Sequence, residues 1–492
     1  MFDDYVRVDT TPLYKNSSDS SKVCHLLWGD GVRFDGSAGS GSRRRVTARG
    51  GRQGFVTKSA LGGKSLLEFY FIDVGQGDGI LIKTPAFRHI MIDGGFPRSL
   101  QDTGKNAADF VDWKFVKDYG KTTIELDAML ASHCDADHYG GLHDLLDVAQ
   151  KDELEAKGVN VEAFFHAGLS WWKSEEGDKF LGQSTTQDGK EFWTQLLGDR
   201  AHAESVTGDG SSVKLHGWWH DFIETVVNTK TRLGQPTPIN RLSNEALFVP
   251  DFGPNDDSEP TIRALGPVKF DVANKPALRQ FPGGTSINTN GVSLLLRVDY
   301  GRTRVLLTGD LNKASQHALL EDYAGQRTEF LSDVAKACHH GSDDISYQFL
   351  QALQPAATVI SSGDNEGHDH PRPSIIAASA TTGHLQLVDD ELLTPLVYST
   401  ELARSIDLGR PEKLVARDSS GTEITISHGD LDRAILHITK AKRTEVALST
   451  ARVVGGLIYG LVNVRTDGDK ILCAVLDEGE NDWRIKTFRS RF

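Results

Sequence analysis

Short apolar runs separated by glycine turns mark the first 63 residues. Residues 23–34 (VCHLLWGDGVRF) place a Gly-Asp turn between two apolar runs, and residues 52–61 (RQGFVTKSAL) place Gly54 before Phe55 and Val56. Short strands broken by glycine turns are typical of small β-barrels. The pattern therefore predicts a separate β domain over residues 1–63.

From residue 64 onward, strand-length apolar runs alternate with segments of helical periodicity. The apolar runs are bounded by glycines and Pro85, whereas residues 142–148 and 314–323 repeat apolar positions at helical spacing. Alternating strands and helices predict an α/β layered domain, which we place at residues 64–410. Its expected strands include residues 66–74, 79–82, 89–92 and 126–132.

An insertion is expected at about residues 170–260, where no clear period is present. The segment is rich in Gly and Asp and contains two Trp-Trp pairs, Trp171-Trp172 and Trp218-Trp219. Long loops of this kind often form lids or walls of binding sites. Packing of a subdomain core explains the tryptophans equally well.

The last part of the chain, residues 411–492, is predicted to be a small β-containing appendage. Strand-like runs occur at residues 423–427, 461–464 and 471–476. Asp467-Gly468 between the last two runs is a hairpin turn signal.

Composition and charge restrict the function further. The 492 residues carry a formal net charge of −14, which argues against long, non-specific wrapping of nucleic acid, because phosphate binding needs clustered cations. A local basic patch or a bound metal could still receive phosphate. The run Arg43-Arg44-Arg45 is either a polyanion contact or a solvated turn.

The termini and the cysteines indicate the compartment. The N-terminus Met1-Phe2-Asp3-Asp4 lacks the basic and apolar regions of a signal peptide. No run reaches the about 18 apolar residues of a membrane span, and four Cys in so long a chain form no disulfide framework. We therefore expect a cytoplasmic protein without a membrane partner.

Candidate metal ligands are concentrated in residues 126–142 (LDAMLASHCDADHYGGL). An apolar strand ends at Ser132, and His133, Asp135, Asp137 and His138 follow within six positions. Alternate residues of an extended loop point the same way, so these side chains can converge on one or two divalent ions. The alternative is a helix-capping cluster with Asp137 as the N-cap, but a cap explains neither histidine.

Two glycines follow this run directly. Gly140 and Gly141 carry no Cβ, so the next helix can begin close to neighbouring backbone without a clash.

The run resembles the metal-binding signature of the metallo-β-lactamase fold, His-x-His-x-Asp-His, with Asp135 in place of the second histidine. That substitution is characteristic of the branch that includes the hydrolase domain of the ComEC/Rec2 competence proteins. Further landmarks of the branch occur in order between residues 66 and 400: FIDVGQGDG at 71–79, MIDGG at 91–95, NGVSLL at 290–295, LLTGDL at 306–311, HHGS at 339–342, and His370-Pro371 after residues 361–363.

This resemblance implies an αββα sandwich that carries a hydrolase site. Residues 1–63 resemble, over about forty residues, bacterial SH3-like domains, in which a Gly-Asp turn comes early and a Gly-aromatic-Val element closes the fold. The expected architecture is therefore an α/β sandwich with an N-terminal SH3-like β-barrel and a C-terminal β-containing appendage.

Later segments of the chain supply further candidate ligands. Asp310 stands on a tight turn behind Gly309, where its carboxylate can bridge two cations; the alternative is a cap for the helix near Lys313. His339 and His340 follow an apolar strand, and adjacent side chains on a strand point oppositely. We assign His340 to the metal and His339 to a supporting or substrate-contacting role, with the reverse assignment open.

Several other candidate residues lie in sequence patterns that are less specific for a function. His166 ends an apolar run and is either a ligand or a structural histidine. Asp73 and Asp93 are expected to hydrogen-bond loop backbones beneath the metals, or to be exposed turn acids. Cys134 and Cys338 are expected to be small buried hydrophobes. Lys336 and Arg372 are candidate phosphate contacts.

The implied cofactors are two divalent ions, Zn²⁺ or Mn²⁺. His133, Asp135 and His166 would hold one ion, Asp137, His138 and His340 the other, and Asp310 would lie between them. A carboxylate at Asp135 makes the first site harder, so Mn²⁺ competes with Zn²⁺. Two such ions supply hydroxide near neutral pH for attack on phosphorus.

The expected catalytic residues are Asp137, His339 and His370. His339 or His370 would stabilise developing charge or protonate the leaving oxygen. The alternative for His370 is a polar loop residue.

Three functions are compatible with this sequence. The first is a phosphodiesterase or nuclease acting on nucleotides or nucleic-acid strands, and the acidic net charge favours a small phosphodiester or a strand end. The second is a hydrolase of a carboxylic ester, lactone or lactam, since a fold does not decide which bond is cleaved. The third is a catalytically silent binding module, recruited to a protein or polymer partner through the SH3-like domain.

Overall fold

The computed structural model describes residues 2–36, 41–101, 103–363, 370–400, 460–477 and 482–492, together with 406–409, 414–417, 420, 422–426, 430, 435–437, 445–447 and 453–455. Its contacts divide the chain into two compact units, Met1–Glu401 with Gly460–Phe492, and Leu402–Tyr459. The second unit thus begins near the expected boundary at residue 411, but it ends before the last strands of the chain.

The N-terminal segment of the larger unit is an antiparallel six-stranded sheet with the strand order β1-β4-β5-β6-β2-β3. Val6, Leu13, Val32 and Val46 are buried in its core. The β-rich nature expected for residues 1–63 is thus present, and the likeness to SH3 domains stays a prediction. The strands are β1 (Asp4–Tyr5), β2 (Thr10–Tyr14), β3 (Lys22–Leu27), β4 (Gly31–Phe34), β5 (Arg43–Ala48) and β6 (Arg52–Thr57).

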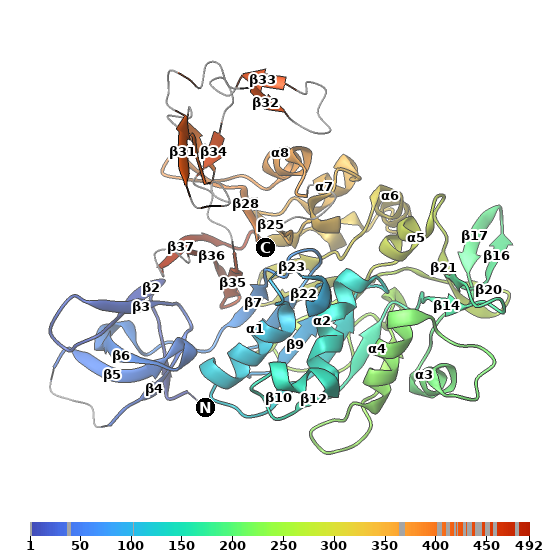
Figure 1. The fold of residues 1–492 in the computed structure, drawn as a ribbon, viewed down its shortest axis with the longest axis horizontal. Coiled ribbons are helices and arrows are strands. Elements are labelled where there is room, and N and C mark those ends of the chain that lie inside the picture. The colour runs from blue at the N-terminus through green and yellow to red at the C-terminus, as the bar shows by residue number, and fades with distance from the viewer. Residues whose placement is uncertain are drawn as a thin grey trace. The chain divides into compact units, whose positions relative to one another are not determined.

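The first large sheet of the same unit has nine strands. Figure 1 labels β7, β9, β35, β36 and β37 of this sheet. β9, β11, β13 and β18 run parallel to one another. In sheet order, the strands are β18 (Ile239–Arg241), β13 (Phe164–His166), β11 (Ala128–Ala131), β9 (His89–Ile92), β8 (Ile80–Lys83), β7 (Leu67–Phe71), β35 (Val462–Thr466), β36 (Lys470–Asp477) and β37 (Asp482–Arg489).

Three of these nine strands come from the end of the sequence. β35 pairs antiparallel with β7, and it joins β36 through the turn at Asp467-Gly468 that the sequence predicts. Residues 460–492 therefore belong to the larger unit, because their apolar side chains are buried in its sheet rather than in a separate appendage.

The second large sheet has six strands, of which the last four run parallel to one another. The backbone N–H of Leu294 donates to the Ser132 carbonyl, which connects this sheet to the end of β11. In order, the strands are β19 (Thr261–Gly266), β22 (Leu295–Tyr300), β23 (Thr303–Leu307), β24 (Val334–Lys336), β25 (Ala357–Ile360) and β28 (Leu396–Ser399).

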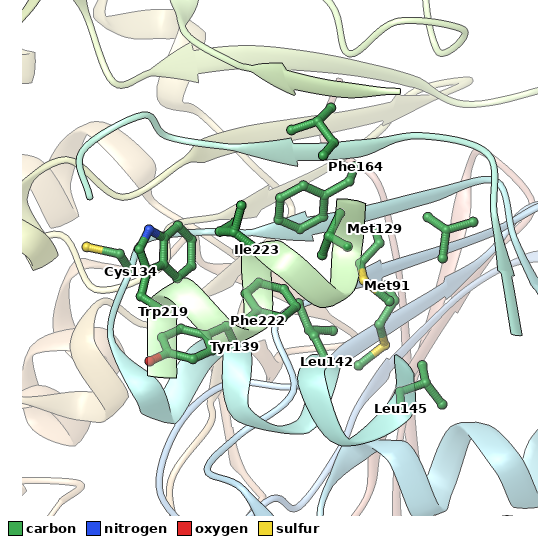
Figure 2. Close-up of a cluster of buried hydrophobic side chains, with 14 of the residues drawn as sticks. Met91, Met129, Cys134, Tyr139, Leu142, Leu145, Phe164, Trp219, Phe222 and Ile223 are labelled. Atoms are coloured by element: carbon green, nitrogen blue, oxygen red, sulfur yellow. The ribbon is translucent and has the colours of Figure 1, made fainter. Parts of the chain in front are cut away.

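Helices cover a face of each large sheet, which makes the unit a layered α/β structure as expected. Leu142, Phe222 and Phe164 bring two helices onto the first sheet (Figure 2). Leu319 and Phe349 do the same on the second sheet. The helices are α1 (Ala107–Trp113), α2 (Ala136–Leu146), α3 (Arg200–Thr207), α4 (Gly217–Asn228), α5 (Thr285–Gly291), α6 (Lys313–Asp322), α7 (Tyr347–Leu353) and α8 (Pro373–Thr382).

The expected insertion contributes to the main core. Trp219 of α4 contacts Tyr139 and Phe222 in edge-on and tilted geometry, beside Cys134 (Figure 2). Trp171 and Trp172 are buried as well, whereas Trp218 is 51% exposed. Packing thus accounts for three of the four tryptophans in the two Trp-Trp pairs.

Smaller sheets complete the described structure. In the larger unit they are β10 (Ile124–Leu126) with β12 (Val159–Val161), β14 (Trp172–Lys173) with β15 (Lys179–Phe180), β16 (Ser184–Gln187) with β17 (Lys190–Trp193), β21 (Lys275–Arg279) and β20 (Lys269–Val272), and β26 (Gln386–Val388) with β27 (Glu391–Thr394). In the smaller unit they are β29 (Ile406–Gly409) with β34 (Val453–Gly455), β30 (Leu414–Arg417) with β31 (Glu423–Ile426), and β32 (Ile435–His437) with β33 (Glu445–Ala447).

None of the helices in the described residues combines the length and the apolar character needed to cross a bilayer.

Candidate metal centre

The candidate site lies where strands of both large sheets end. Asp93 follows β9 and His133 follows β11, and these two strands are parallel. Asp310 follows β23 and His340 follows β24, which are parallel as well. Ligands of open α/β sheets bind outside the carboxyl ends of parallel strands, where such loops meet.

Four side chains from remote segments converge at this place, namely Asp137, His138, Asp310 and His340. The Nε2 atom of His340 lies 2.9 Å from Asp310 Oδ2 and 3.7 Å from Asp137 Oδ2. The Nε2 atom of His138 lies 3.2 Å from Asp310 Oδ2 and 4.0 Å from Asp137 Oδ2. All four ligand atoms thus surround one point.

This geometry fits a divalent ion. Ligand atoms about 2.0–2.2 Å from Zn²⁺ lie roughly 3–4 Å from each other, as they do here. Asp310 Oδ2 lies close to the buried Nε2 atoms of His138 and His340 but makes no well-aligned hydrogen bond with either, so an ion or a water at the point that they face would satisfy both. Two imidazoles and two carboxylates are suitable ligands for Zn²⁺ or Mn²⁺.

The electrostatics of the cluster favour a cation. Burial alone would lower the pKa of His138, but the carboxylates of Asp310, Asp93 and Asp137 raise it well above its usual range. Burial alone would also lower the pKa of His340, but Asp310 and Asp78 raise it to about 10. A bound cation would take over the role of these protons.

Asp93 orients His138 from behind. Its Oδ2 accepts a hydrogen bond from His138 Nδ1 at 2.9 Å, and its Oδ1 accepts one from the Ser132 backbone N–H at 2.7 Å. A carboxylate in this position fixes the tautomer that leaves Nε2 for the metal. Its contact with loop backbone is the role that the sequence indicates.

Asp78 and Lys336 form a buried ion pair beneath His340. Lys336 Nζ lies 2.5 Å from Asp78 Oδ2, and Asp78 Oδ1 lies 3.3 Å from His340 Nδ1. Burial alone would raise the pKa of Asp78, but Lys336 and His340 hold it below its usual range. Asp78 was missed by sequence reasoning, although it ends the FIDVGQGD run. Lys336 is 1% exposed, so it supports the site rather than contacting a phosphate.

The capping alternatives do not describe Asp137 and Asp310. Asp135, not Asp137, is the N-cap of α2, and no side-chain cap bond forms there. Asn312, not Asp310, caps α6 by accepting from the Ser315 N–H. Both carboxylates are therefore directed to the cluster instead.

His133 and Asp135 form a neighbouring pair. His133 Nε2 lies 3.6 Å from Asp135 Oδ2, and the rings of His133 and His138 are 4.0 Å apart. Asp135 Oδ2 accepts from the Thr289 hydroxyl at 2.6 Å and, with the Asn290 amide oriented to satisfy its surroundings, from Asn290 Nδ2 at 3.1 Å.

The structure does not bring His166 into either group. Its Nε2 donates to the Gly198 carbonyl at 3.1 Å. Burial, reinforced by Arg241, lowers the pKa of His166 to about 3, which keeps the ring neutral inside the protein. These contacts are those of a structural histidine.

A cleft opens on the cluster. It has a volume of ≈ 370 Å³ and is lined by Gln76, Asp135, Asp137, Ser286, Asn290, Asp310, His339, His340, Ser342, Asp343, His370 and Arg372. His339 lies beside the cluster, with its Nε2 3.9 Å from Asp310 Oδ2, and its ring centroid is 5.6 Å from that of His370. His339 and His370 thus reach the cleft wall, while His340 points into the cluster.

The two glycines of the motif permit close approach of α2 to the loop after β9. A Cβ on Gly141 would lie 2.0 Å from the Gly94 carbonyl oxygen, and one on Gly140 would lie 2.3 Å from Pro97. Any larger residue would push the ligand-bearing end of α2 away from Asp93.

Three other candidate residues, Asp73, Cys134 and Cys338, make contacts near their own positions. Asp73 is exposed, and its Oδ1 accepts from the Gly75 N–H at 3.3 Å, as a turn acid does. Cys134 and Cys338 are 1% and 2% exposed and pack within apolar clusters. Burial raises the pKa of both thiols, in keeping with apolar packing.

Fold and site together define a layered α/β protein with a buried cluster of two histidines and two aspartates suited to a divalent ion. No established protein-family profile matches the chain. Two curated proteins match short segments: ComE operon protein 3 of Bacillus subtilis (strain 168), 33% identical over 88 residues, and competence protein ComA of Neisseria gonorrhoeae, 36% identical over 91 residues. Each match covers 18% of this chain but only 11% and 13% of the two relatives.

Two solved structures show distant likeness to the chain. One is Tm1679, a metal-dependent hydrolase of the beta-lactamase superfamily, with 12% identity, a TM-score of 0.31, and coverage of 73% of this chain and 99% of that one. Another is a diphosphatase from the PhnP family, with 11% identity, a TM-score of 0.27, and coverage of 60% and 85%. Similarities this low do not assign the chain to a fold family.

Proposed function

We propose that the chain is a metal-dependent hydrolase of phosphoesters, acting on a phosphodiester of nucleotide size or at the end of a nucleic-acid strand. The observation that carries the proposal is the convergence of Asp137, His138, Asp310 and His340 at the wall of an open, polar cleft. A purely structural metal site is closed, whereas hydrolytic sites keep a position open to substrate.

The chemistry of the ion is that of a Lewis acid, and it lowers the pKa of water near it. Asp137, His138, Asp310 and His340 would hold the first ion, with a second expected at His133 and Asp135. Zn²⁺ and Mn²⁺ are both compatible with these ligands.

The chain's own residues supply positioning and proton transfer. Arg372 lines the cleft and can hold a non-reacting phosphoryl oxygen through charge-assisted hydrogen bonds. His339 and His370 line it as well, and either ring can donate a proton to the leaving oxygen. Burial lowers the pKa of His339, which favours the neutral form of its ring.

The charge of the cleft lining favours a small substrate over a long nucleic-acid strand. Arg372 is the only Lys or Arg among its lining residues, all of which belong to the described part of the chain. Binding along a nucleic-acid backbone needs several clustered cations. A compact phosphoester needs only one cation besides the metal.

The test measures metal content and turnover together on the full chain. Wild type and Asp310→Ala are assayed with bis-(p-nitrophenyl) phosphate, single-stranded DNA and a β-lactam, with Asp221→Asn, an exposed acid on α4, as the control. We expect phosphodiester cleavage by wild type and the control, and loss of bound metal and activity in Asp310→Ala. Cleavage of the lactam alone would indicate the ester or lactam hydrolase, and bound metal without any turnover the binding module.

A further inference from the structure

The two groups of candidate ligands, the four-residue cluster and the pair His133 and Asp135, offer different numbers of ligand atoms. The cluster of Asp137, His138, Asp310 and His340 presents four ligand atoms around one point. The pair His133 and Asp135 presents two, 3.6 Å apart, a separation that suits two ligands of one ion.

A third protein ligand for the pair is lacking in the residues that the structure describes. No other His, Cys, Asp or Glu there has a ligand atom within 4.8 Å of both members of the pair. His166, which the sequence suggests for this role, donates its Nε2 proton to Gly198 instead. Asp310 Oδ2 lies between His138 and His340, inside the complete cluster.

The pair is nevertheless prepared for a ligand. The Thr289 hydroxyl donates to Asp135 Oδ2 at 2.6 Å, and Asn290 supports the same oxygen. Ser132 Oγ lies 3.0 Å and Ser293 Oγ 3.3 Å from His133 Nδ1, which directs His133 Nε2 towards Asp135. Such supporting contacts orient metal ligands and raise their affinity.

One member of the pair reaches the cleft. Asp135 is among its lining residues, as are Asn290, Ser286 and His339, whereas His133 is buried at 2% exposure. An oxygen of a molecule bound in the cleft can therefore reach an ion held by the pair, which the chain itself does not enclose.

We propose that His133 and Asp135 form a half-site, which binds a second divalent ion firmly only when oxygens of a phosphoryl group in the cleft complete its coordination. The inference rests on the proposed function for the identity of that group. One ion then resides in the protein, and the second enters together with the phosphoester. Affinity for the second ion and affinity for the phosphoryl group must rise together, because linkage is reciprocal.

The experiment counts ions without measuring turnover. The metal-free full chain is dialysed to equilibrium against graded Mn²⁺, with and without inorganic phosphate as the probe, and bound metal is determined by elemental analysis. We expect one tight ion per chain, a second, weaker one, and a gain in affinity of the second of about tenfold or more with phosphate. Two equally tight ions without phosphate, or no effect of phosphate, would overturn the proposal.

Variants show which residues bind the first ion and which bind the second. The first and second events are these two binding steps. Asp135→Asn is expected to abolish the second event and its phosphate dependence while keeping the first, and Thr289→Val to weaken only the second, by about 10–100-fold. His166→Gln is the matched control and is expected to change neither event. A lower stoichiometry in His166→Gln, or loss of the tight ion in Asp135→Asn, would contradict the half-site.

The two proposals can fail separately. Phosphate-dependent binding of the second ion in a chain that cleaves no phosphoester would refute the proposed function but leave the half-site standing. Turnover with two equally tight ions would do the reverse. Circular dichroism of each variant shows whether it has folded, and Thr289→Val provides a second substitution that removes no ligand.

Discussion

The ammonium group of Lys336 lies 2.5 Å from the carboxylate of Asp78, and both side chains are buried at 1% exposure. Lys336 Nζ also donates to the Gly309 carbonyl at 2.8 Å, so the pair connects β24 with the turn that carries Asp310. Removing one member of a buried ion pair leaves the other charge without compensation, which destabilises the folded chain.

Lys336→Met is therefore expected to destabilise the chain by about 3–5 kcal/mol, because it leaves the Asp78 carboxylate buried without its cation. Urea unfolding followed by tryptophan fluorescence measures the change. The double variant Asp78→Asn with Lys336→Met removes both charges and should recover a large part of the loss. If the single and double variants are equally unstable, the pairing of these charges is not what stabilises this region.

Trp219→Ala is expected to cost about 3–5 kcal/mol, the usual range for deleting a buried tryptophan. Trp219 is 1% exposed and packs on Tyr139, the residue after the candidate ligand His138. Trp218→Ala removes the neighbouring, 51% exposed side chain and should change the free energy of unfolding by less than about 0.5 kcal/mol. Equal effects of the two substitutions would show that the insertion does not support the core as described.

The stability of the chain should depend on pH through His166. Its pKa is lowered to about 3 by burial, whereas an unfolded histidine titrates near about 6.5. The unfolded state therefore binds the proton first, so this contribution is fully present above about pH 6.5 and is lost as the pH falls towards 3. Between about pH 6.5 and 5 the loss amounts to about 2 kcal/mol.

His166→Gln isolates this contribution. Glutamine does not titrate, so the difference between the unfolding free energies of wild type and variant should change with pH over that window. A constant difference from pH 7 to 5 would mean that His166 binds protons equally in the folded and the unfolded chain, so that burial does not lower its pKa.

Local patterns predict much of this fold. The apolar runs at 89–92 and 126–132 became buried strands because continuous apolar sequence suits a sheet covered on both faces. The helix expected at 142–148 begins earlier, at Ala136, and ends at Leu146. Its first turn holds the polar residues Asp137 and His138, which conceal the apolar periodicity that sequence reasoning uses.

Pairing between remote segments was not predictable in the same way. Nothing in residues 462–466 indicates that they pair with β7, almost 400 positions earlier, because the partner of a strand is chosen by tertiary packing. The six other candidate ligands lie in or beside one region, but His166 does not join them. A histidine at a strand end has the same local sequence whether its ring faces a metal or a backbone carbonyl such as that of Gly198.

Arg372→Ala is expected to raise KM for a phosphodiester by about 10–100-fold with a smaller change in kcat, since a charge-assisted hydrogen bond contributes about 1.5–3 kcal/mol. Arg372 lines the cleft together with the candidate ligands Asp137, Asp310 and His340. Steady-state kinetics with bis-(p-nitrophenyl) phosphate give both constants, and Arg372→Lys should recover part of the loss.

Arg45→Ala serves as the control for overall charge. Arg45 is exposed on β5 of the N-terminal sheet. An equal rise of KM in both alanine variants would indicate a general electrostatic effect instead of a contact in the cleft.

The smaller unit leaves and rejoins the rest of the chain at adjacent points. The Gly460 N–H donates to the Thr400 carbonyl at 2.6 Å, just beyond the end of β28 and before the start of β35. A module attached through two touching residues can be lengthened, shortened or exchanged during evolution without altering the register of either sheet. Changes of length between Thr400 and Gly460 are therefore expected to leave in place the strands that carry the candidate metal cluster.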